Sequence, residues 1–411
     1  MLVPRIVLRR LKSTVETRSG APILELPEKS ETTIELDFAS DIERVLYLLL
    51  YRSTKRQVLR YLQSKEAKRK ARQASCTSLT EIDTDRPLFM HVFELILRLR
   101  QVCNSCALVT ADPLADVRMR VEKLAGNEGL DGMSSFSDAE AELLKRFRKQ
   151  RSGADSGFGH GSLESTKLTA LMKELKSVRA CRERVLVISQ WTSFLDMIGA
   201  HLEVHNAQCE ARVSSLNDAR ETGNEAIAFA KLDGRMSAKE REQVVHNFQQ
   251  KEVSFDRGSV VGPLLDVLLL SLRTGGLGLN LTAAAHVFIV EPSWNPSLEH
   301  QAIDRAHRFG QTKQVRVVRF IVKSSIEERV MALQTKKRQL TATFLGDSDI
   351  VSSTNKNNRL RETRLSTRDI RTLFFTQQEQ VEEVDLRRLD GRTGHARNDD
   401  AESSDGGVTC I

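Results

Sequence analysis

The stretch from Ser271 to Gln311 constrains the fold of this chain more than any other part of it. It follows the short apolar run Val267–Leu270 and contains a second one, Val287–Val290; both runs are typical of buried parallel strands. Between them lies the segment Thr274–Gly278, whose glycines allow a sharp turn and bring backbone N–H groups close to a phosphate or a neighbouring chain. Strands and helices alternate from about residue 165 to 340, and this alternation predicts an α/β fold with a mainly parallel sheet.

A polar helix is expected after the second of these strands. Pro292 and Pro296 interrupt the chain, and we expect Ser297 to cap the helix that follows. Four polar residues recur at spacings of three or four, and so share about one helix face. They are Gln301, Asp304, Arg305 and Arg308. Arginine binds phosphate through a planar, permanently charged fork, so this face is a candidate phosphate site; the alternative is a solvated helix surface.

These segments together resemble motifs V and VI of the Swi/Snf-type branch of the superfamily 2 helicase-like ATPases. The resemblance is carried by Ser271–Leu281, by Trp294-Asn295-Pro296 and by Gln301–Gln311, of which the ending RAHRFGQ is the most specific piece. It implies the C-terminal RecA-like lobe of a DNA-dependent ATPase, closest to the DNA-repair and remodelling branch. The RING-type zinc module of that branch has no counterpart here, because Cys103 and Cys106 have no second Cys/His pair nearby.

The resemblance also implies roles for individual residues. Arg305 and Arg308 would face the triphosphate of ATP, with Arg308 as the preferred γ-phosphate finger. The residues that would bind or orient the nucleotide are Gly275, Gly276, Gln301 and Asp304. The residues that would contact DNA are Ser189, Gln190, Trp191, Arg273, Thr274 and Asn280. For Trp191, an anchoring role in the core is the alternative to stacking on DNA.

Two motifs that such a motor needs are absent from the 411 residues. There is no GxxxxGK[ST] loop to hold the β-phosphate and no Asp-Glu-x-His to hold Mg²⁺. We therefore expect the C-terminal half of an ATP-dependent, DNA-stimulated translocase, inactive alone and dependent on a first motor lobe for ATP and Mg²⁺. A non-catalytic remnant that binds DNA or protein is the alternative. A dinucleotide enzyme has less support, because Gly275-Gly276-x-Gly278 does not form a GxGxxG motif.

Periodicity and composition divide the chain into six predicted segments. In order, they are the end of the first motor lobe with its junction (1–40), a helical protrusion (41–109), a flexible insertion (110–163), the RecA-like lobe (164–345), a basic bracing tail (346–387) and a disordered end (388–411). Further strands are expected at Thr32–Phe38, Val185–Ile188, Phe229–Leu232 and Val315–Val322. Within the lobe, residues 205–224 are polar and are expected to be an insertion.

The distribution of charge is more informative than its total. A net charge of +7 from 62 basic and 55 acidic residues is a weak signal for a polyanionic partner. The segment Arg52–Arg72, however, carries nine basic residues and a single acid, Glu66. Such a run is either a solvated helix face or a contact for DNA phosphates. No apolar run approaches the ~20 residues that span a bilayer. The resemblance to the helicase-like ATPases further implies a nuclear protein that binds double-stranded DNA, with nucleosomes as a candidate substrate, and we expect no membrane partner.

Overall fold

A six-stranded parallel sheet forms the centre of the molecule, in the order β1-β6-β5-β2-β4-β3. This computed structural model describes residues 26–74, 86–109, 165–215, 226–250, 265–274, 278–346 and 366–375. The strands are β1 (Lys29–Leu36), β2 (Val185–Ser189), β3 (Phe229–Leu232), β4 (Val267–Ser271), β5 (His286–Ile289) and β6 (Val315–Val322). The predicted α/β class with a mainly parallel sheet is confirmed.

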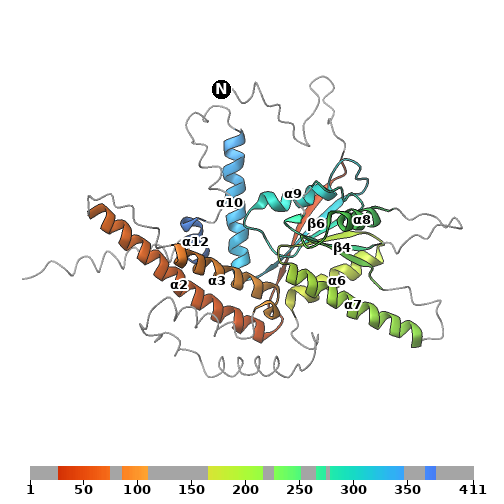
Figure 1. Cartoon of the computed structure of the whole chain (residues 1–411), viewed down its shortest axis with the longest axis horizontal. Helices are drawn as coiled ribbons and strands as arrows, with labels where there is room; N and C mark the ends of the chain where they lie inside the picture. The colour runs from red at the N-terminus through yellow and green to blue at the C-terminus, as the bar shows by residue number, and fades with distance from the viewer. Residues whose placement is uncertain are drawn as a thin grey trace, which may run out of the picture.

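Helices cover both faces of the sheet (Figure 1). Successive side chains along a strand point to opposite faces, so the apolar side chains of one strand are buried under helices on both sides. The helices are α6 (Thr166–Ala180), α7 (Thr192–Ser215), α8 (Ala238–Gln249) and α9 (Pro296–Ala306). Val187 of β2 lies in the core cluster that includes side chains of α6 and α7. Its neighbour Leu186 lies in the cluster on the other face, with side chains of α8 and α9. The apolar runs of the sequence are therefore strands that helices cover on both faces.

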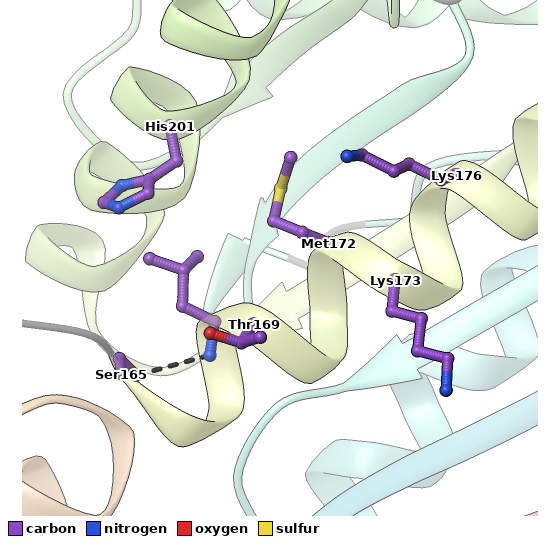
Figure 2. Close-up of a pocket in the computed structure, with 7 residues that line it drawn as sticks. Ser165, Thr169, Met172, Lys173, Lys176 and His201 are labelled. Atoms are coloured by element: carbon purple, nitrogen blue, oxygen red, sulfur yellow. Dashed lines mark hydrogen bonds between the residues drawn. The ribbon is translucent and has the colours of Figure 1, made fainter. Parts of the chain in front are cut away.

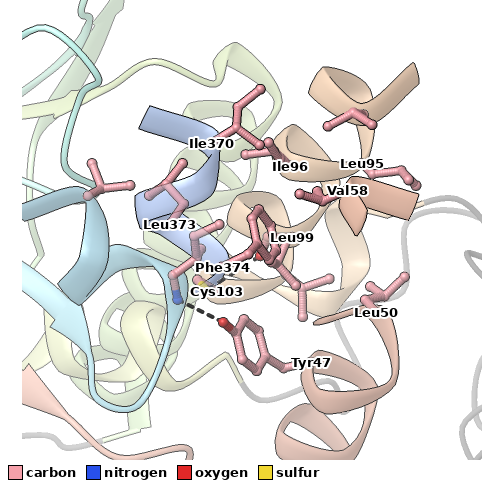
Figure 3. Close-up of a cluster of buried hydrophobic side chains, with 14 of the residues drawn as sticks. Tyr47, Leu50, Val58, Leu95, Ile96, Leu99, Cys103, Ile370, Leu373 and Phe374 are labelled. Atoms are coloured by element: carbon pink, nitrogen blue, oxygen red, sulfur yellow. Dashed lines mark hydrogen bonds between the residues drawn. The ribbon is translucent and has the colours of Figure 1, made fainter. Parts of the chain in front are cut away.

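A second group of helices packs beside the sheet. It consists of α2 (Asp41–Ala74), α3 (Arg86–Asn104), α10 (Ile326–Gly346) and α12 (Thr367–Phe374). Their buried side chains form one cluster, in which Leu50, Leu99 and Phe374 meet (Figure 3). The Tyr47 hydroxyl accepts a hydrogen bond from the backbone N–H of Ile326 at 2.7 Å. The segments at the two ends of the described chain are thus held together by one core.

The start of the lobe differs from the sequence expectation in one respect. The strand predicted in the junction segment 1–40 is present as β1, and it is an edge strand of the lobe's own sheet. It pairs in parallel with β6, with Lys29 opposite Val315 and Leu36 opposite Val322. The sheet therefore includes residues that precede the helical protrusion, and the helices α2 and α3 are inserted between β1 and the rest of the lobe.

The first part of the predicted insertion 205–224 is helical, because α7 continues to Ser215, and residues 216–224 lie outside the described residues. Two features hold this extension on the lobe. The Asn206 side chain bonds both to the carbonyl of Ile227, at 2.9 Å, and to its N–H, at 2.8 Å. Cys209 is buried one turn further on. Residues 1–25, the predicted insertion 110–163 and the predicted disordered end 388–411 lie outside the described residues.

An ion pair fixes β1 to β6. A carboxylate oxygen of Glu31 accepts from the Arg319 guanidinium at 2.8 Å, and the other oxygen lies 2.6 Å from Lys29 Nζ. Partial burial raises the pKa of Glu31, but the hydrogen bonds and charges of these two cations outweigh it and lower the pKa to about 2.

Glu31 should therefore make the stability of the chain depend on pH in the acid range. Because its pKa in the folded state is below the ordinary value of 4.5, its contribution is present above pH 4.5 and is lost as the pH falls toward 2. We expect Glu31→Gln to lower the free energy of unfolding by about 1 kcal/mol at pH 7 and by much less near pH 2, where the carboxyl is largely protonated in the unfolded state and partly protonated in the folded state. Urea unfolding at both pH values measures this, with Glu35→Gln as control. An equal loss at both pH values would contradict the ion-pair explanation.

Candidate functional site

The predicted site residues lie at opposite ends of the parallel sheet. Ser189 ends β2, with Gln190 and Trp191 directly after it, and Arg273 and Thr274 follow β4, so these five share the carboxyl end of the strands. Helix α9 then runs back toward the amino end of the strands. There the Arg305 carbonyl accepts a hydrogen bond from the N–H of Leu281, which lies before the start of β5. Arg305 and Arg308 therefore lie toward the amino end of the strands. Gly275 and Gly276 lie outside the described residues.

The bounds of α9 correct two expectations. The N-cap is Asn295, not Ser297: the Asn295 side-chain oxygen accepts from the Ser297 N–H at 3.0 Å, and the helix begins at Pro296. The helix ends at Ala306, with His307 as its C-cap. Gln301, Asp304 and Arg305 are on the helix as predicted, and Gln301 and Asp304 are exposed. Arg308 is not on the helix but in the turn that follows it.

This turn, residues 307–311, is called here the arginine turn, and Gln311 anchors it. The buried Gln311 amide donates to the carbonyls of Ala306, at 3.1 Å, and Ala284, at 2.9 Å. Its side-chain oxygen accepts from the N–H groups of Thr312 and Lys313, each at 2.9 Å. The side chain thus replaces the hydrogen bonds that the end of a helix leaves open. Sequence reasoning assigned Gln311 to the motif but not to this role.

Two further contacts fix the conformation of the arginine turn. Gly310 has a φ of 96°, a value that residues with a side chain rarely adopt. The His307 ring nitrogen Nε2 lies 2.8 Å from the carbonyl oxygen of Pro27, directly before β1. Arg308 and Phe309 point outward from this support, since both are exposed and Phe309 has 77% of its surface accessible. Within the described residues the Arg308 guanidinium has no ion-pair partner. The turn therefore presents a cation that is not engaged in an ion pair with any other described part of the chain.

A buried carboxylate organises the carboxyl end of the sheet. Glu291, just after β5, accepts from the Ser189 hydroxyl at 2.9 Å, from the Gln190 N–H at 2.5 Å and from the Asn104 amide at 3.0 Å. Burial raises the pKa of Glu291, while the charge of Lys167 opposes that shift. The segment after β2, which carries three of the predicted DNA contacts, is thereby tied to β5 and to α3.

Lys167 extends this network to α10. Its ammonium group is fully buried and donates to Glu327 Oε1 at 2.6 Å, to Asn104 Oδ1 at 3.0 Å and to the Val290 carbonyl at 2.7 Å. The second Glu327 oxygen accepts from the Val322 N–H at 3.1 Å. We did not predict any of these buried groups from the sequence, because a lysine in the first turn of an amphipathic helix looks like a surface residue.

Arg100 of α3 joins the same region from the side. Its buried guanidinium lies 4.6 Å from the centre of the Trp294 ring and donates to the Pro292 carbonyl. It also donates to the side-chain oxygen of Gln190. Burial lowers the pKa of Arg100, and the nearby Glu291 carboxylate opposes that shift. Helix α3 thus supports the predicted DNA-contacting segment from below the surface.

The predicted DNA contacts differ in how far they reach the surface. Ser189 and Thr274 are buried, and the Thr274 hydroxyl lies 3.1 Å from the Ser271 hydroxyl, so any contact with DNA at these two positions would come through the backbone. Arg273 is exposed. Trp191 is half-buried against the core cluster that includes α6 and α7, the placement expected of a core anchor, with part of its ring accessible.

Asn280 lies apart from the other predicted DNA contacts. Its carbonyl accepts from the Gln249 side chain at 2.7 Å, at the end of α8. The Arg184 side chain, directly before β2, bonds the carbonyls of Phe248 and Gln250 and so places that end of α8 at the amino end of the strands. Asn280 is exposed there, on the side of the arginine turn.

Other features of the described residues do not coincide with the predicted site. A hollow of about 490 Å³ lies between α6 and α7 (Figure 2) and is lined by Ser165, Leu168, Thr169, Met172, Lys173, Lys176 and His201. None of the predicted site residues lines it. Among the described residues no three His, Cys, Asp or Glu side chains are grouped so that they could hold a metal ion. No helix in the described ranges has the length and apolar character of a membrane span.

Helicase-like proteins are similar to this chain over most of its length. Residues 166–310 match the helicase conserved C-terminal domain. The chain is 38% identical to the DNA repair protein RAD5A of Arabidopsis thaliana over 191 residues, which cover 46% of this chain and 16% of that protein. It is 28% identical to the helicase-like transcription factor of Homo sapiens over 420 residues, 88% of this chain and 37% of that protein. A solved structure of the C-terminal part of the Fun30 ATPase domain covers 89% of this chain and 99% of that one, with 22% identity and a TM-score of 0.47. The chain thus spans well under half the length of these two relatives.

Proposed function

We propose that this chain is the C-terminal half of an ATP-dependent motor of the Swi/Snf type, stimulated by double-stranded DNA; the match of residues 166–310 to the helicase conserved C-terminal domain supports this. The observation that carries the proposal is the arginine turn, which is fixed by Gln311, Gly310 and His307 and presents Arg308 outward. A fixed cation without a structural partner is what stabilisation of a phosphate in a transition state requires.

The arginine turn suits contact with the phosphates of ATP. In the proposed reaction the γ-phosphoryl group is the one that is transferred. The planar guanidinium of Arg308 can donate two parallel hydrogen bonds to phosphate oxygens. Arg305, one helical turn earlier and partly buried, adds a second cation to the same end of α9. In the proposal, Gln301 and Asp304 orient this face, and Gly275 and Gly276 link the nucleotide to the DNA side. In the proposal a first motor lobe binds both Mg²⁺ and the β-phosphate, because the GxxxxGK[ST] and Asp-Glu-x-His motifs do not occur in these 411 residues.

The DNA would lie across the carboxyl end of the strands. Gln190, Trp191 and Arg273 are the side chains that reach the surface there, and phosphate and stacking contacts suit these residue types. The buried network around Glu291 would hold this segment rigid. Because both relatives are named for DNA repair or transcription, we propose a nuclear role in repair or remodelling, with double-stranded DNA, free or in nucleosomes, as substrate.

The proposal is tested by measuring DNA-stimulated ATP hydrolysis by this chain alone and after addition of the first lobe of a RAD5-type relative. Turnover only in the mixture is the expected result, with the first lobe alone as control. Turnover by the chain alone would overturn the half-motor proposal, because it would require a nucleotide site within these residues. No turnover in either case, with salt-sensitive DNA binding intact, would favour the alternative of a non-catalytic DNA-binding remnant.

A further inference from the structure

A row of cations follows one side of helix α2. Arg52, Arg56, Arg60 and Lys70 are all exposed, and we call this set the α2 stripe. At 3.6 residues per turn these four positions fall within an arc of ~80°. At 1.5 Å per residue the row is about 27 Å long, and consecutive arginines are about 6 Å apart along the axis.

An apolar face on the side of α2 opposite the stripe packs against the neighbouring helices. It carries Leu46, Leu50, Val58 and Leu62, which are buried in the cluster shared with α3, α10 and α12; Leu50 and Val58 are labelled in Figure 3. The cationic and apolar residues therefore occupy separate faces, and the cations point away from the core.

The charge pattern of the stripe opposes helix stability. A solvated helix face is normally stabilised by opposite charges at i,i+4, whereas like charges at that spacing destabilise by about 0.2–0.5 kcal/mol per pair. Arg52, Arg56 and Arg60 form two such like-charge pairs. Within α2 no acid stands three or four residues from Arg52, Arg56 or Arg60, so the row lacks the opposite-charge spacing along the helix that is typical of a solvated face.

The position of α2 joins the stripe to the proposed DNA side of the lobe. Glu43 in the first turn of α2 contacts Thr166, the first residue of α6. The next residue, Lys167, bonds the Val290 carbonyl directly after β5. Helix α2 therefore leaves the sheet from the carboxyl end of the strands, the end that also carries Gln190 and Arg273, and extends to one side of it (Figure 1).

We propose that the α2 stripe is an additional contact for the phosphate backbone of double-stranded DNA, outside the helicase motifs. This inference rests on the proposed function, since it needs duplex DNA at the carboxyl end of the sheet. Duplex DNA carries one phosphate charge per ~1.7 Å of its axis, so a 27 Å row of cations meets several phosphates, and the contact is independent of base sequence.

The test uses the 411-residue chain and a labelled mixed-sequence duplex, with affinity measured over a series of salt concentrations. The variant is Arg52→Gln/Arg56→Gln/Arg60→Gln. We expect binding about tenfold or more weaker at 0.1 M salt, and a plot of log affinity against log salt that is shallower by about 2 to 3. The Tm should change little, because two like-charge pairs within α2 are removed and glutamine is also a good helix former.

The matched control removes the same charge elsewhere, with Lys173→Gln/Lys176→Gln/Lys239→Gln on the exposed surfaces of α6 and α8. Its affinity should stay within about twofold of the unchanged chain. Equal weakening by both triple variants would overturn the proposal, since the effect would then come from net charge alone. Absence of duplex binding by the unchanged chain would instead contradict the proposed DNA function itself, and the stripe with it.

Discussion

Replacing Arg308 by alanine in a two-lobe protein that contains this chain is expected to lower kcat for DNA-stimulated ATP hydrolysis by about 10³- to 10⁵-fold. The reason is that the charge on the γ-phosphoryl group spreads over its oxygens in the transition state, and a fixed guanidinium stabilises that charge more than it stabilises bound ATP. The KM for ATP should change little. Steady-state kinetics at saturating DNA measure both quantities.

The fold predicts that this variant remains stable, which makes the kinetic result interpretable. Arg308 is exposed, and the arginine turn is held by the side chains of Gln311 and His307 and by the backbone of Gly310. The Tm of Arg308→Ala should therefore match that of the unchanged protein. Lys313→Ala, which removes an exposed cation two residues beyond the turn, is the matched control and should keep nearly full activity. A loss below tenfold for Arg308→Ala, together with a large loss for Arg305→Ala, would transfer the finger role to Arg305.

The strands of this lobe were predictable because they are buried on both faces. Runs such as Val185–Ile188 and Val267–Leu270 are apolar without interruption, which is the pattern that a doubly covered parallel strand requires. The start of α8 follows from local sequence in the same way, since Ser237 and Glu240 are three residues apart and form a capping box. In these places local sequence and the final contacts agree.

The details of the arginine turn could not be predicted from periodicity. The spacing of Gln301, Asp304, Arg305 and Arg308 continues a helical pattern without a break, and only Gly310 signals an end. What stops the helix at Ala306 is a set of long-range contacts, from Gln311 to Ala284 and from His307 to Pro27. Sequence spacing carries no information about either partner.

The buried ionic network was also beyond sequence reasoning, and it leads to the second large prediction. Lys167→Met is expected to lower the free energy of unfolding by about 3–5 kcal/mol, because it leaves the buried Glu327 carboxylate without its cation. It also removes the donor from Asn104 Oδ1 and from the Val290 carbonyl. Urea unfolding of the chain measures the loss, with the milder Lys167→Gln in reserve should the methionine variant fail to fold.

Two further variants separate the buried pair from a general effect of removing lysine. Lys231→Met breaks the ion pair between Lys231 and Asp196, whose side chains are 35% and 40% exposed respectively. It should lower the free energy of unfolding by only about 0–1 kcal/mol. The double variant Lys167→Met/Glu327→Gln should recover part of the loss, because the unpaired charge is gone while one side-chain oxygen can still accept from the Val322 N–H. Equal losses for Lys167→Met and Lys231→Met would show that burial does not strengthen the first pair. No recovery in the double variant would mean that the contacts of Lys167 with Asn104 and Val290, and not its charge, hold α6 on the carboxyl end of the sheet.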